Sequence, residues 1–162
     1  MKNGKRWVRV LLWAAVCMTA VMIFLFSAET GEKSSETSDT VTEAVIRLFD
    51  AGYDQRTPEE QEDIFSFASL VVRKCAHFTE FALLGLLVRL LFASYTDRHR
   101  SLAAWGAGTA YAVTDEVHQY FVSQRAAMGA DVLIDSLGVM AGVLVAWTLV
   151  ALVKRAKGAD RA

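Results

Sequence analysis

Uncharged runs alternate with charged patches along this chain. No charged residue stands from Val10 to Ala28, a run of 19 residues, or from Ser136 to Val153, a run of 18. Helices of about 18 or more apolar residues are long enough to cross a hydrocarbon core that is roughly 30 Å thick. The pattern therefore predicts an integral membrane protein.

Two shorter apolar stretches complete the pattern, and the four together predict a four-transmembrane-helix bundle. The expected spans cover, to within a few residues, 7–27, 70–93, 102–121 and 130–153. The expected fold class is all-α, a polytopic integral membrane protein with an extracytoplasmic helical loop, 28–69, between the first two spans. With 162 residues the chain has the length of one domain, so residues 1–162 are expected to form a single membrane domain.

Basic residues are unevenly distributed, although the totals nearly balance at 17 Lys and Arg against 18 Asp and Glu. They gather before the first span, in the 97–100 loop and after the last span. Cytoplasmic loops of membrane proteins carry an excess of Lys and Arg. We therefore place these three regions, and both termini, in the cytoplasm. The acidic 28–69 loop and the short 122–129 loop then lie outside.

The first span has some features of a signal peptide, because four basic residues between Lys2 and Arg9 precede its apolar run. The best cleavage point follows Ala28, where Phe26 occupies the position that normally holds a small residue. We therefore expect an uncleaved membrane anchor.

The sequence supports neither a disulfide or cysteine metal site nor a nucleic-acid partner. Cys17 and Cys75 lack CxxC spacing, so they predict neither a disulfide nor a cysteine metal site, and we expect both to be small buried residues. The basic residues at the inner ends of the spans are explained by topology and by attraction to anionic lipids. No nucleic-acid partner is therefore expected.

The long outer loop contains signals for helices. Thr57 is a suitable N-cap, Pro58 suits the first helical position, and Glu60 completes a capping box. These residues predict a helix that starts above the membrane near Pro58 and continues into the second span. The stretch 38–50 is amphipathic; it could lie on the membrane interface, pack on the bundle, or simply connect the two elements.

Three of the four spans carry polar residues near the same, outer end. The second span begins with "RKCAHFTE", the third ends with "TDEVHQ", and the fourth begins with "ADVLID". The expected polar cluster consists of Lys74, His77, Glu80, Asp115, Glu116, His118, Gln119, Arg125, Asp131 and Asp135. Helical spacing places Arg73, His77 and Glu80 on one face of the second span.

The fourth span combines its acidic residues with glycines on one stripe. Asp131 and Asp135 are four residues apart, and the stripe continues with Gly138 and Gly142. The GxxxG spacing lets another helix approach closely, so this stripe is expected to face into the bundle. In the third span, Gly106 and Ala110 could have the same role.

The polar cluster has two interpretations, a structural network of ion pairs or a functional site. A charged side chain in the membrane centre costs about 2.5–3.5 kcal/mol on insertion scales, and such residues are usually functional. We favour a site centred on Glu116, Asp115, Arg125 and His77. The two aspartates of the fourth span would then hold Arg125 or a ligand.

Three segments of the chain resemble the VanZ-like family of small bacterial membrane proteins, named after a teicoplanin-resistance protein. They are "FSAETGEKSSETS" after the first span, "RKCAHFTEFALLG" at the second, and "DEVHQYFVSQRAAMGADVLIDSLG" across the third and fourth. The family motif covers Lys74, His77, Glu80, Asp115, Glu116, Gln119, Arg125, Asp131, Asp135 and Gly138. Where family members often have Pro-Gly and Ser-Gln, this chain has Ser123-Gln124 and Ala28-Glu29.

The resemblance implies a bacterial cytoplasmic-membrane protein that lowers susceptibility to the lipoglycopeptide teicoplanin. Teicoplanin carries an acyl chain and acts on lipid-linked cell-wall precursors, so a site at outer-leaflet depth could meet either molecule. The drug connection comes only from the family, whereas the depth of the site comes from the arrangement of the spans.

Three mechanisms remain open from the residues. In the first, Arg73, Lys74 and Arg125 hold the phosphate of an anionic lipid or precursor for binding or transport. In the second, His77 and the carboxylates bind a divalent metal, suited to magnesium or manganese, for hydrolysis at a lipid phosphate. No catalytic motif such as HExxH supports an enzyme. In the third, the polar residues lock the bundle of a partner protein, and the oligomeric state is open.

Overall fold

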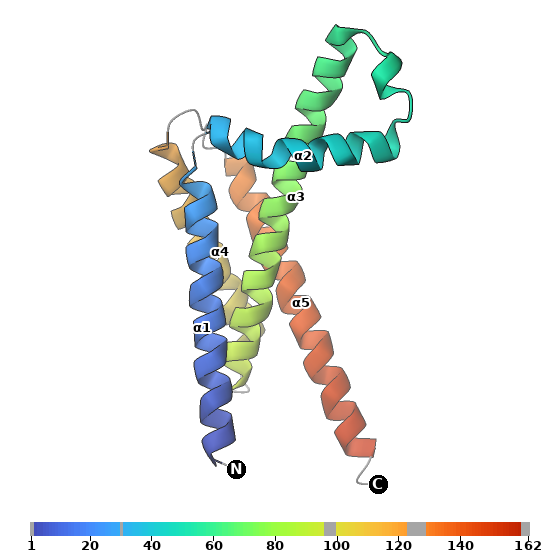
Figure 1. Ribbon diagram of the computed structural model, residues 1–162. Helices are drawn as coiled ribbons and strands as arrows, with labels where there is room; N and C mark the ends of the chain where they lie inside the picture. The colour runs from blue at the N-terminus through green and yellow to red at the C-terminus, as the bar shows by residue number, and fades with distance from the viewer. Residues whose placement is uncertain (1, 30, 96–99, 123–128, 160–162) are drawn as a thin grey trace.

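The computed structural model describes residues 2–29, 31–95, 100–122 and 129–159, and this part of the chain is all-α (Figure 1). Five α-helices and one short 3₁₀ helix follow one another in the order α1 Lys2–Ser27, α2 Gly31–Phe49, η1 Tyr53–Gln55, α3 Pro58–Ala93, α4 Arg100–Tyr120 and α5 Gly129–Ala159. The predicted all-α class is confirmed.

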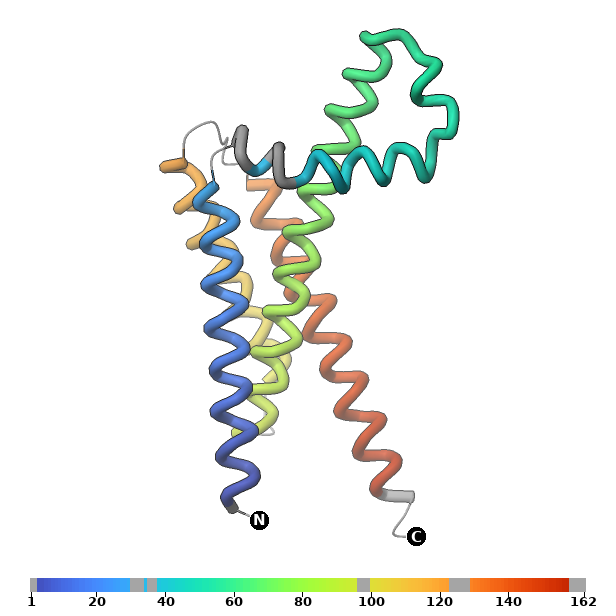
Figure 2. Tube along the Cα trace, viewed as in Figure 1, coloured from blue at the N-terminus to red at the C-terminus, as the bar shows by residue number. Residues whose placement is uncertain are grey.

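Helices α1, α3, α4 and α5 lie side by side and alternate in direction (Figures 1 and 2). Three of them are long and apolar enough to cross a membrane, over Asn3–Ser27, Pro58–Ala93 and Gly129–Lys157. The chain is therefore a multi-pass membrane protein. Helix α4 coincides with the third predicted span and runs antiparallel to α3, but its glycine-rich and polar sequence makes it less apolar. Its crossing of the membrane stays a prediction.

The two ends of the bundle differ in what they carry (Figure 1). We call the end with α2 and the start of α3 the loop end. The other end, where α1 begins and α5 finishes, is called the terminal end.

Helix α3 begins where its capping residues predict. The Thr57 hydroxyl accepts a hydrogen bond from the Glu60 N–H at 3.3 Å, and the Glu60 carboxylate accepts one from the Thr57 N–H at 2.9 Å. The helix then continues for 36 residues, which corresponds to about 54 Å. That length exceeds a hydrocarbon core of roughly 30 Å. The predicted start near Pro58 and the continuation into the second span are confirmed, whereas the position of the first turns above the membrane stays a prediction.

Helix α2 lies across the bundle and packs on α3 (Figure 1). It buries Thr42 and Ile46, whereas Val41, Leu48 and Phe49 are exposed. An apolar face that is only partly covered fits a helix at the membrane interface. The amphipathic stretch predicted for 38–50 therefore belongs to a longer helix with both a buried and an exposed apolar side.

Glycines set the close approach of α3 and α5. A Cβ at Gly138 would overlap the Phe78 carbonyl, and one at Gly142 would overlap the Ala82 carbonyl. In a membrane, association of helices depends on such close packing, because lipid is as apolar as the side chains. On α3, Gly85 lies in the same way against the backbone of Val139.

The third span uses a different glycine from the expected one. Gly106 and Ala110 are exposed, and a Cβ at Gly106 would have nothing within 4 Å. Gly108 is buried instead, against the Val139 side chain. The prediction for Gly106 and Ala110 was wrong because the rotation of α4 about its axis is set by its neighbours, which a stripe of small residues does not reveal.

The buried core of the bundle combines Phe81 with aliphatic side chains, namely Ile23, Leu84, Val88, Ala104, Ala112, Val139 and Val143. Many larger apolar side chains on α1 and α5, such as Leu11 and Leu144, are exposed instead. Lipid covers such surfaces without the cost they would have in water. Cys17 and Cys75 are free and also exposed, so the prediction that they are buried was wrong.

Candidate functional site

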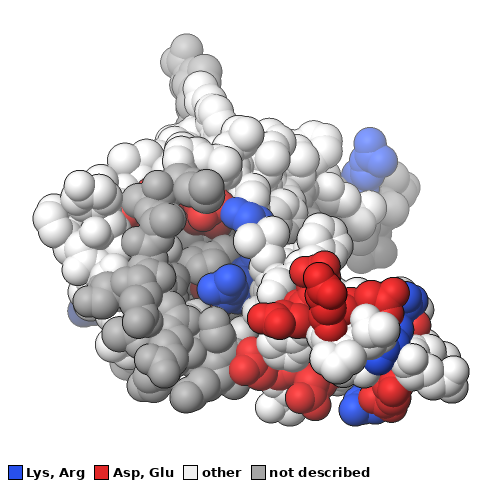
Figure 3. Space-filling model, turned by 90° about the horizontal axis from the view of Figure 1, so that it is seen from above, with Lys and Arg blue, Asp and Glu red and all other residues white. Residues whose placement is uncertain are grey.

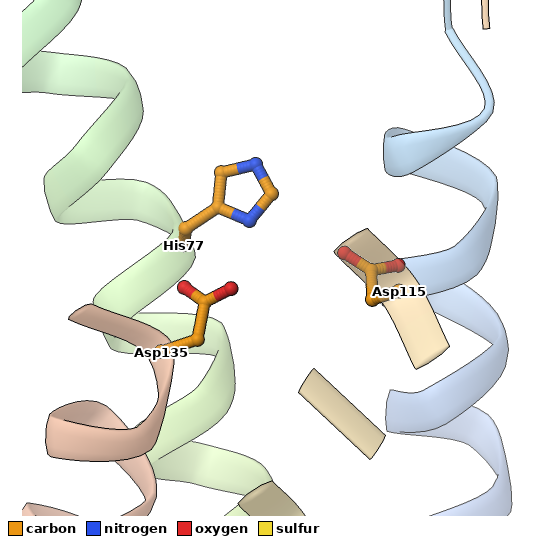
Figure 4. A group of neighbouring side chains, drawn as sticks. All are labelled: His77, Asp115 and Asp135. Carbon is orange, nitrogen blue, oxygen red and sulfur yellow. The ribbon is translucent and has the colours of Figure 1, made fainter. Parts of the chain in front are cut away.

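Three of the sequence-predicted residues meet between three different helices. His77 of α3, Asp115 of α4 and Asp135 of α5 each offer one ligand atom, and these atoms lie within 4.8 Å of one another. Figure 4 shows His77 and Asp135 side by side, with Asp115 facing them. Asp115 is 3% exposed and Asp135 is 2% exposed. We call these three residues the polar triad.

Each member of the polar triad continues an inward-facing stripe of its own helix, toward the loop end. The stripes are Phe81, Leu84 and Val88 on α3, Ala104, Gly108 and Ala112 on α4, and Val139, Val143 and Ala146 on α5. Because residues three and four apart share a helix face, packing of the apolar stripes also turns the three polar side chains inward. The site is therefore held by the core below it.

A serine from α1 adds a fourth helix to the site. One carboxylate oxygen of Asp115, Oδ2, accepts hydrogen bonds from Ser27 Oγ and from Gln119 Nε2, each at 2.8 Å. Gln119 Nε2 also donates to Ser27 Oγ at 3.2 Å. Ser27 is fully buried. These bonds fix the Asp115 carboxylate in one orientation.

The other oxygen of Asp115 is the one that remains for a ligand. Asp115 Oδ1 is buried and has no hydrogen-bond partner among the residues that the structure describes. A buried polar atom without a partner is costly and calls for an explanation. A bound cation, proton donor or ligand at the polar triad would supply one.

Ser27 was not singled out by the sequence interpretation, although it lies in the quoted segment "FSAETGEKSSETS". The available signal was its position next to the end of the uncharged run Val10–Ala28. A serine there can equally cap a helix or face the membrane surface. Only the packing of α1 against α4 brings it to Asp115.

The remaining acidic and aromatic members of the predicted cluster lie around the polar triad. Glu116 follows Asp115 and is also buried, with 8% of its surface exposed. His118 stacks on the Phe24 ring of α1, with 4.4 Å between ring centroids. His118 therefore takes part in the contact between α1 and α4. Glu80 is half-buried one turn after His77 on α3.

Lys74 and Asp131 form an ion pair that links α3 to α5 nearer the loop end. Both side chains are 33% exposed, so the pair lies at the edge of the bundle. Arg125, together with Ser123 and Gln124, lies outside the described residues. The expectation that Asp131 and Asp135 hold Arg125 stays a prediction.

A cavity of about 240 Å³ opens beside the polar triad, between the end of α1, α2 and α3. Its walls combine charged, hydroxyl and apolar side chains: Phe26, Glu29, Ser34, Ser38, Val41, Val72, Arg73, Ala76, His77 and Glu80. We call it the upper cavity. His77 belongs both to this wall and to the polar triad, so it connects the two.

Acidic side chains are concentrated on one part of the loop end. Seen onto this end, they gather over the arm formed by α2, η1 and the start of α3, with basic side chains among them, and further basic and acidic side chains lie together nearer the bundle (Figure 3). Within the arm, Arg56 Nε lies 2.8 Å from Asp50 Oδ2, and Arg47 Nη1 lies 2.9 Å from Asp54 Oδ2.

The polar triad can perform two kinds of chemistry. One imidazole nitrogen and two carboxylate oxygens make a suitable donor set for a divalent cation. The same groups can accept and release protons beside a bound anionic ligand. Of the wider ligand set considered from the sequence, the structure brings together one residue from each of α3, α4 and α5.

A family model described as VanZ/LLP1 matches residues 11–152 of the chain. This range includes the polar triad, Ser27 and both packing glycines of α5. No curated protein and no solved structure matched the chain.

Proposed function

The chain belongs to the VanZ/LLP1 family, and on this premise we propose that it lowers susceptibility to teicoplanin by binding or moving an anionic lipid or lipid-linked cell-wall precursor at its loop end. The VanZ family is linked to teicoplanin resistance. The observation that carries the proposal is the polar triad of His77, Asp115 and Asp135, because it joins three helices beside the upper cavity and both of its aspartates are buried. Ionisable groups buried in this way within a membrane bundle usually serve a function.

The proposed topology has four spans, with α4 as the third, and both termini in the cytoplasm. It is supported by the alternating directions of α1, α3, α4 and α5, which place the start of α1 and the finish of α5 at the same end (Figure 1). Basic residues flank these two positions, which fits a cytoplasmic location. The loop end, with the upper cavity, then faces the outside of the bacterial cytoplasmic membrane.

The size of the upper cavity favours a headgroup over a whole antibiotic. Its volume of about 240 Å³ is below the range of about 300–1,000 Å³ that is usual for drug-sized ligands. Arg73 in its wall offers a planar fork that matches phosphate oxygens. Apolar wall residues such as Val72 and Phe26 suit the start of an acyl or prenyl chain.

In this proposal the polar triad acts behind the bound phosphate. His77 lies in the wall of the upper cavity and can donate to a phosphate oxygen or exchange a proton with it. Asp115, held by Ser27 and Gln119, and Asp135 stabilise the protonated imidazole.

A metal-assisted membrane hydrolase that acts on a lipid phosphate is a second candidate function. It is favoured by the donor set of the triad and by the buried Oδ1 of Asp115. A divalent cation bound there would act as a Lewis acid toward a phosphoryl oxygen. Binding of manganese to the purified chain distinguishes the two candidates: loss of stoichiometric binding in Asp135→Asn supports the hydrolase, and absence of binding in the wild type removes it.

The proposed function is tested by drug susceptibility of a Gram-positive host. The host expresses the wild type, Asp115→Asn, Asp135→Asn or the control Glu62→Gln, at matched membrane levels. Glu62 is an exposed carboxylate on the part of α3 outside the bundle. We expect a teicoplanin-selective rise in the inhibitory concentration that is lost in both triad variants and kept in the control. Full resistance in Asp115→Asn and Asp135→Asn would contradict the proposal, and so would an equal effect on vancomycin.

A further inference from the structure

A second, larger cavity lies at the terminal end of the bundle. Its volume is about 440 Å³, and it lies between the end of α3, the start of α4 and the last turns of α5. Three basic residues contribute to its wall, Arg89, Arg100 and Lys154, beside the apolar side chains of Leu102 and Trp147. No carboxylate occurs among the described residues that line it. We call it the lower cavity.

The burial of Arg89 is not explained by the tendency of basic residues to mark the cytoplasmic side of a membrane protein. It stands one turn before the end of α3, close enough for its long side chain to extend into water. Instead it is only 3% exposed. A basic residue that merely marks the cytoplasmic side would have no reason to turn inward between three helices.

The guanidinium of Arg89 is incompletely satisfied by the described protein. Its Nε donates to Ser101 Oγ at 2.8 Å, whereas its Nη1 is buried without a hydrogen-bond partner in the described part of the chain. No ion pair joins Arg89 to a described carboxylate within 4.0 Å. A buried charge without compensation is strongly unfavourable. The missing partner therefore has to supply acceptor oxygens and negative charge.

The neighbouring wall shows what else that partner carries. Trp147 is 55% exposed and Leu102 is 66% exposed, beside the basic residues. Tryptophan is enriched where the headgroups of a bilayer meet its hydrocarbon, and basic pockets between membrane helices bind phosphate headgroups. A free phosphate ion would use the cations and leave this apolar rim unused. A phospholipid would use both.

We propose that the lower cavity binds the phosphate of an anionic phospholipid, with Arg89 as its buried contact and Lys154 and Arg100 at its rim. The acyl chains lie along Trp147 and Leu102. This site is distinct from the upper cavity, because the upper cavity is lined by Val72 to Glu80 near the middle of α3 and the lower cavity by Arg89 near its end. The proposed role of the lower cavity is to hold a bound lipid. This role does not depend on the function proposed for the loop end.

The experiment uses the purified full chain in a neutral detergent. It is titrated with phosphatidylglycerol or phosphatidylcholine, and bound lipid is counted by native mass spectrometry. We expect one phosphatidylglycerol to bind with at least about tenfold preference over phosphatidylcholine, because bonds between charged partners contribute most to such recognition. The variants are Arg89→Gln, Lys154→Gln and the control Arg155→Gln. Arg155 is exposed, adjacent in sequence to Lys154 and outside the cavity wall.

The variants distinguish a specific lipid-binding site from nonspecific electrostatic attraction between basic residues and anionic lipid. Lys154→Gln, at an exposed position, is expected to fold normally and to weaken phosphatidylglycerol binding about fivefold or more, as is usual for a basic residue near anionic lipid. Arg89→Gln is expected to weaken it further, and Arg155→Gln to change it less than about twofold. Equal losses in Lys154→Gln and Arg155→Gln would overturn the proposal. Unchanged binding in folded Arg89→Gln and Lys154→Gln would do so too.

A competition arm identifies the source of the phosphate. Inorganic phosphate is added to the complex of wild type and phosphatidylglycerol. The lipid is expected to stay bound, because its chains contribute to affinity along the apolar rim. Displacement of the lipid at phosphate concentrations similar to those of the lipid would show that the ligand is a free anion, and the proposal would fail.

Discussion

At the scale of single residues, a short list of inward-facing side chains defines the site. The arrangement of the spans predicted that His77, Asp115 and Asp135 lie at a similar depth near the outer end of the bundle. It could not tell which of them meet, because that depends on how each helix is rotated about its axis. The interpretation therefore gave Glu116 a central place, whereas the structure puts Asp135 in the polar triad. Ser27 was missed for the same reason.

Ser27→Ala tests whether the bonds to Asp115 hold α1 in place. The substitution removes a donor to a buried carboxylate, and such a loss costs about 1–3 kcal/mol. We expect a corresponding decrease in the free energy of unfolding in detergent, measured by denaturant titration. The control is Thr148→Ala, where an exposed hydroxyl bonds only within its own helix. An unfolding free energy equal to that of the wild type in Ser27→Ala would contradict this role.

At the scale of elements, local signals predicted helix boundaries better than helix packing. Thr57, Pro58 and Glu60 predicted the start of α3 because a capping box acts among neighbours in sequence. The stripe of Gly138 and Gly142 also pointed to a close helix contact, and the structure places it against α3. The similar pattern at Gly106 led to a wrong assignment, since a small residue permits a close contact without requiring one.

Substitution of glycines by alanine distinguishes the packed from the open positions. Gly142→Ala forces a methyl group into the Ala82 backbone of α3, and overpacking of this kind costs about 1–3 kcal/mol. Gly106→Ala adds the same group where nothing lies within 4 Å, so we expect no loss of stability. The melting temperatures of both variants are measured by thermal unfolding in detergent, monitored by circular dichroism. Similar melting temperatures for the two variants would contradict the described α3–α5 contact.

The arm at the loop end is expected to loosen in acid. The side-chain bond from Arg56 lowers the pKa of Asp50, and the backbone N–H of Thr57 lowers the pKa of Glu60. A carboxyl group whose folded pKa is lowered contributes stability above its unfolded pKa, and that stability is lost as the pH falls through the folded value. The loss therefore begins below about pH 4.

Hydrogen exchange measures this loosening directly. After correction for intrinsic rates, amides of the η1 turn and the first turn of α3 should exchange faster below about pH 4 than at neutral pH. In Glu60→Gln the acid-dependent part of the change at α3 should shrink, because glutamine keeps a capping group but does not titrate. An unchanged acid response in that variant would assign the effect to other groups.

At the scale of the whole molecule, the sequence predicted the all-α class and four spans, of which three correspond to helices long and apolar enough to cross a membrane. The crossing of α4 stays a prediction. Hydropathy identifies α1, α3 and α5 without ambiguity. Helix α4 is less apolar because it carries the packing glycine and the polar residues of the site. The two cavities could not be predicted, since each is formed by side chains from helices that are far apart in sequence.

The proposed orientation is tested by cysteine labelling in intact bacterial cells. Glu62→Cys marks the loop end and Lys157→Cys marks the terminal end, each in a background with Cys17→Ser and Cys75→Ser. A membrane-impermeant maleimide is expected to label the first in intact cells and the second only after lysis. Labelling in the reverse order would place the termini outside. Labelling of both in intact cells would require an odd number of spans.

Helix α3 passes both cavities without a proline after its first turn, and this makes it a mechanical link across the bilayer. His77 and Arg89 are 12 positions apart in the sequence, or about 18 Å along the axis. If both proposed sites hold a ligand, a tilt of α3 at one site would move the side chain at the other. Binding at the two proposed sites would then be coupled reciprocally, each ligand changing the affinity for the other by the same factor.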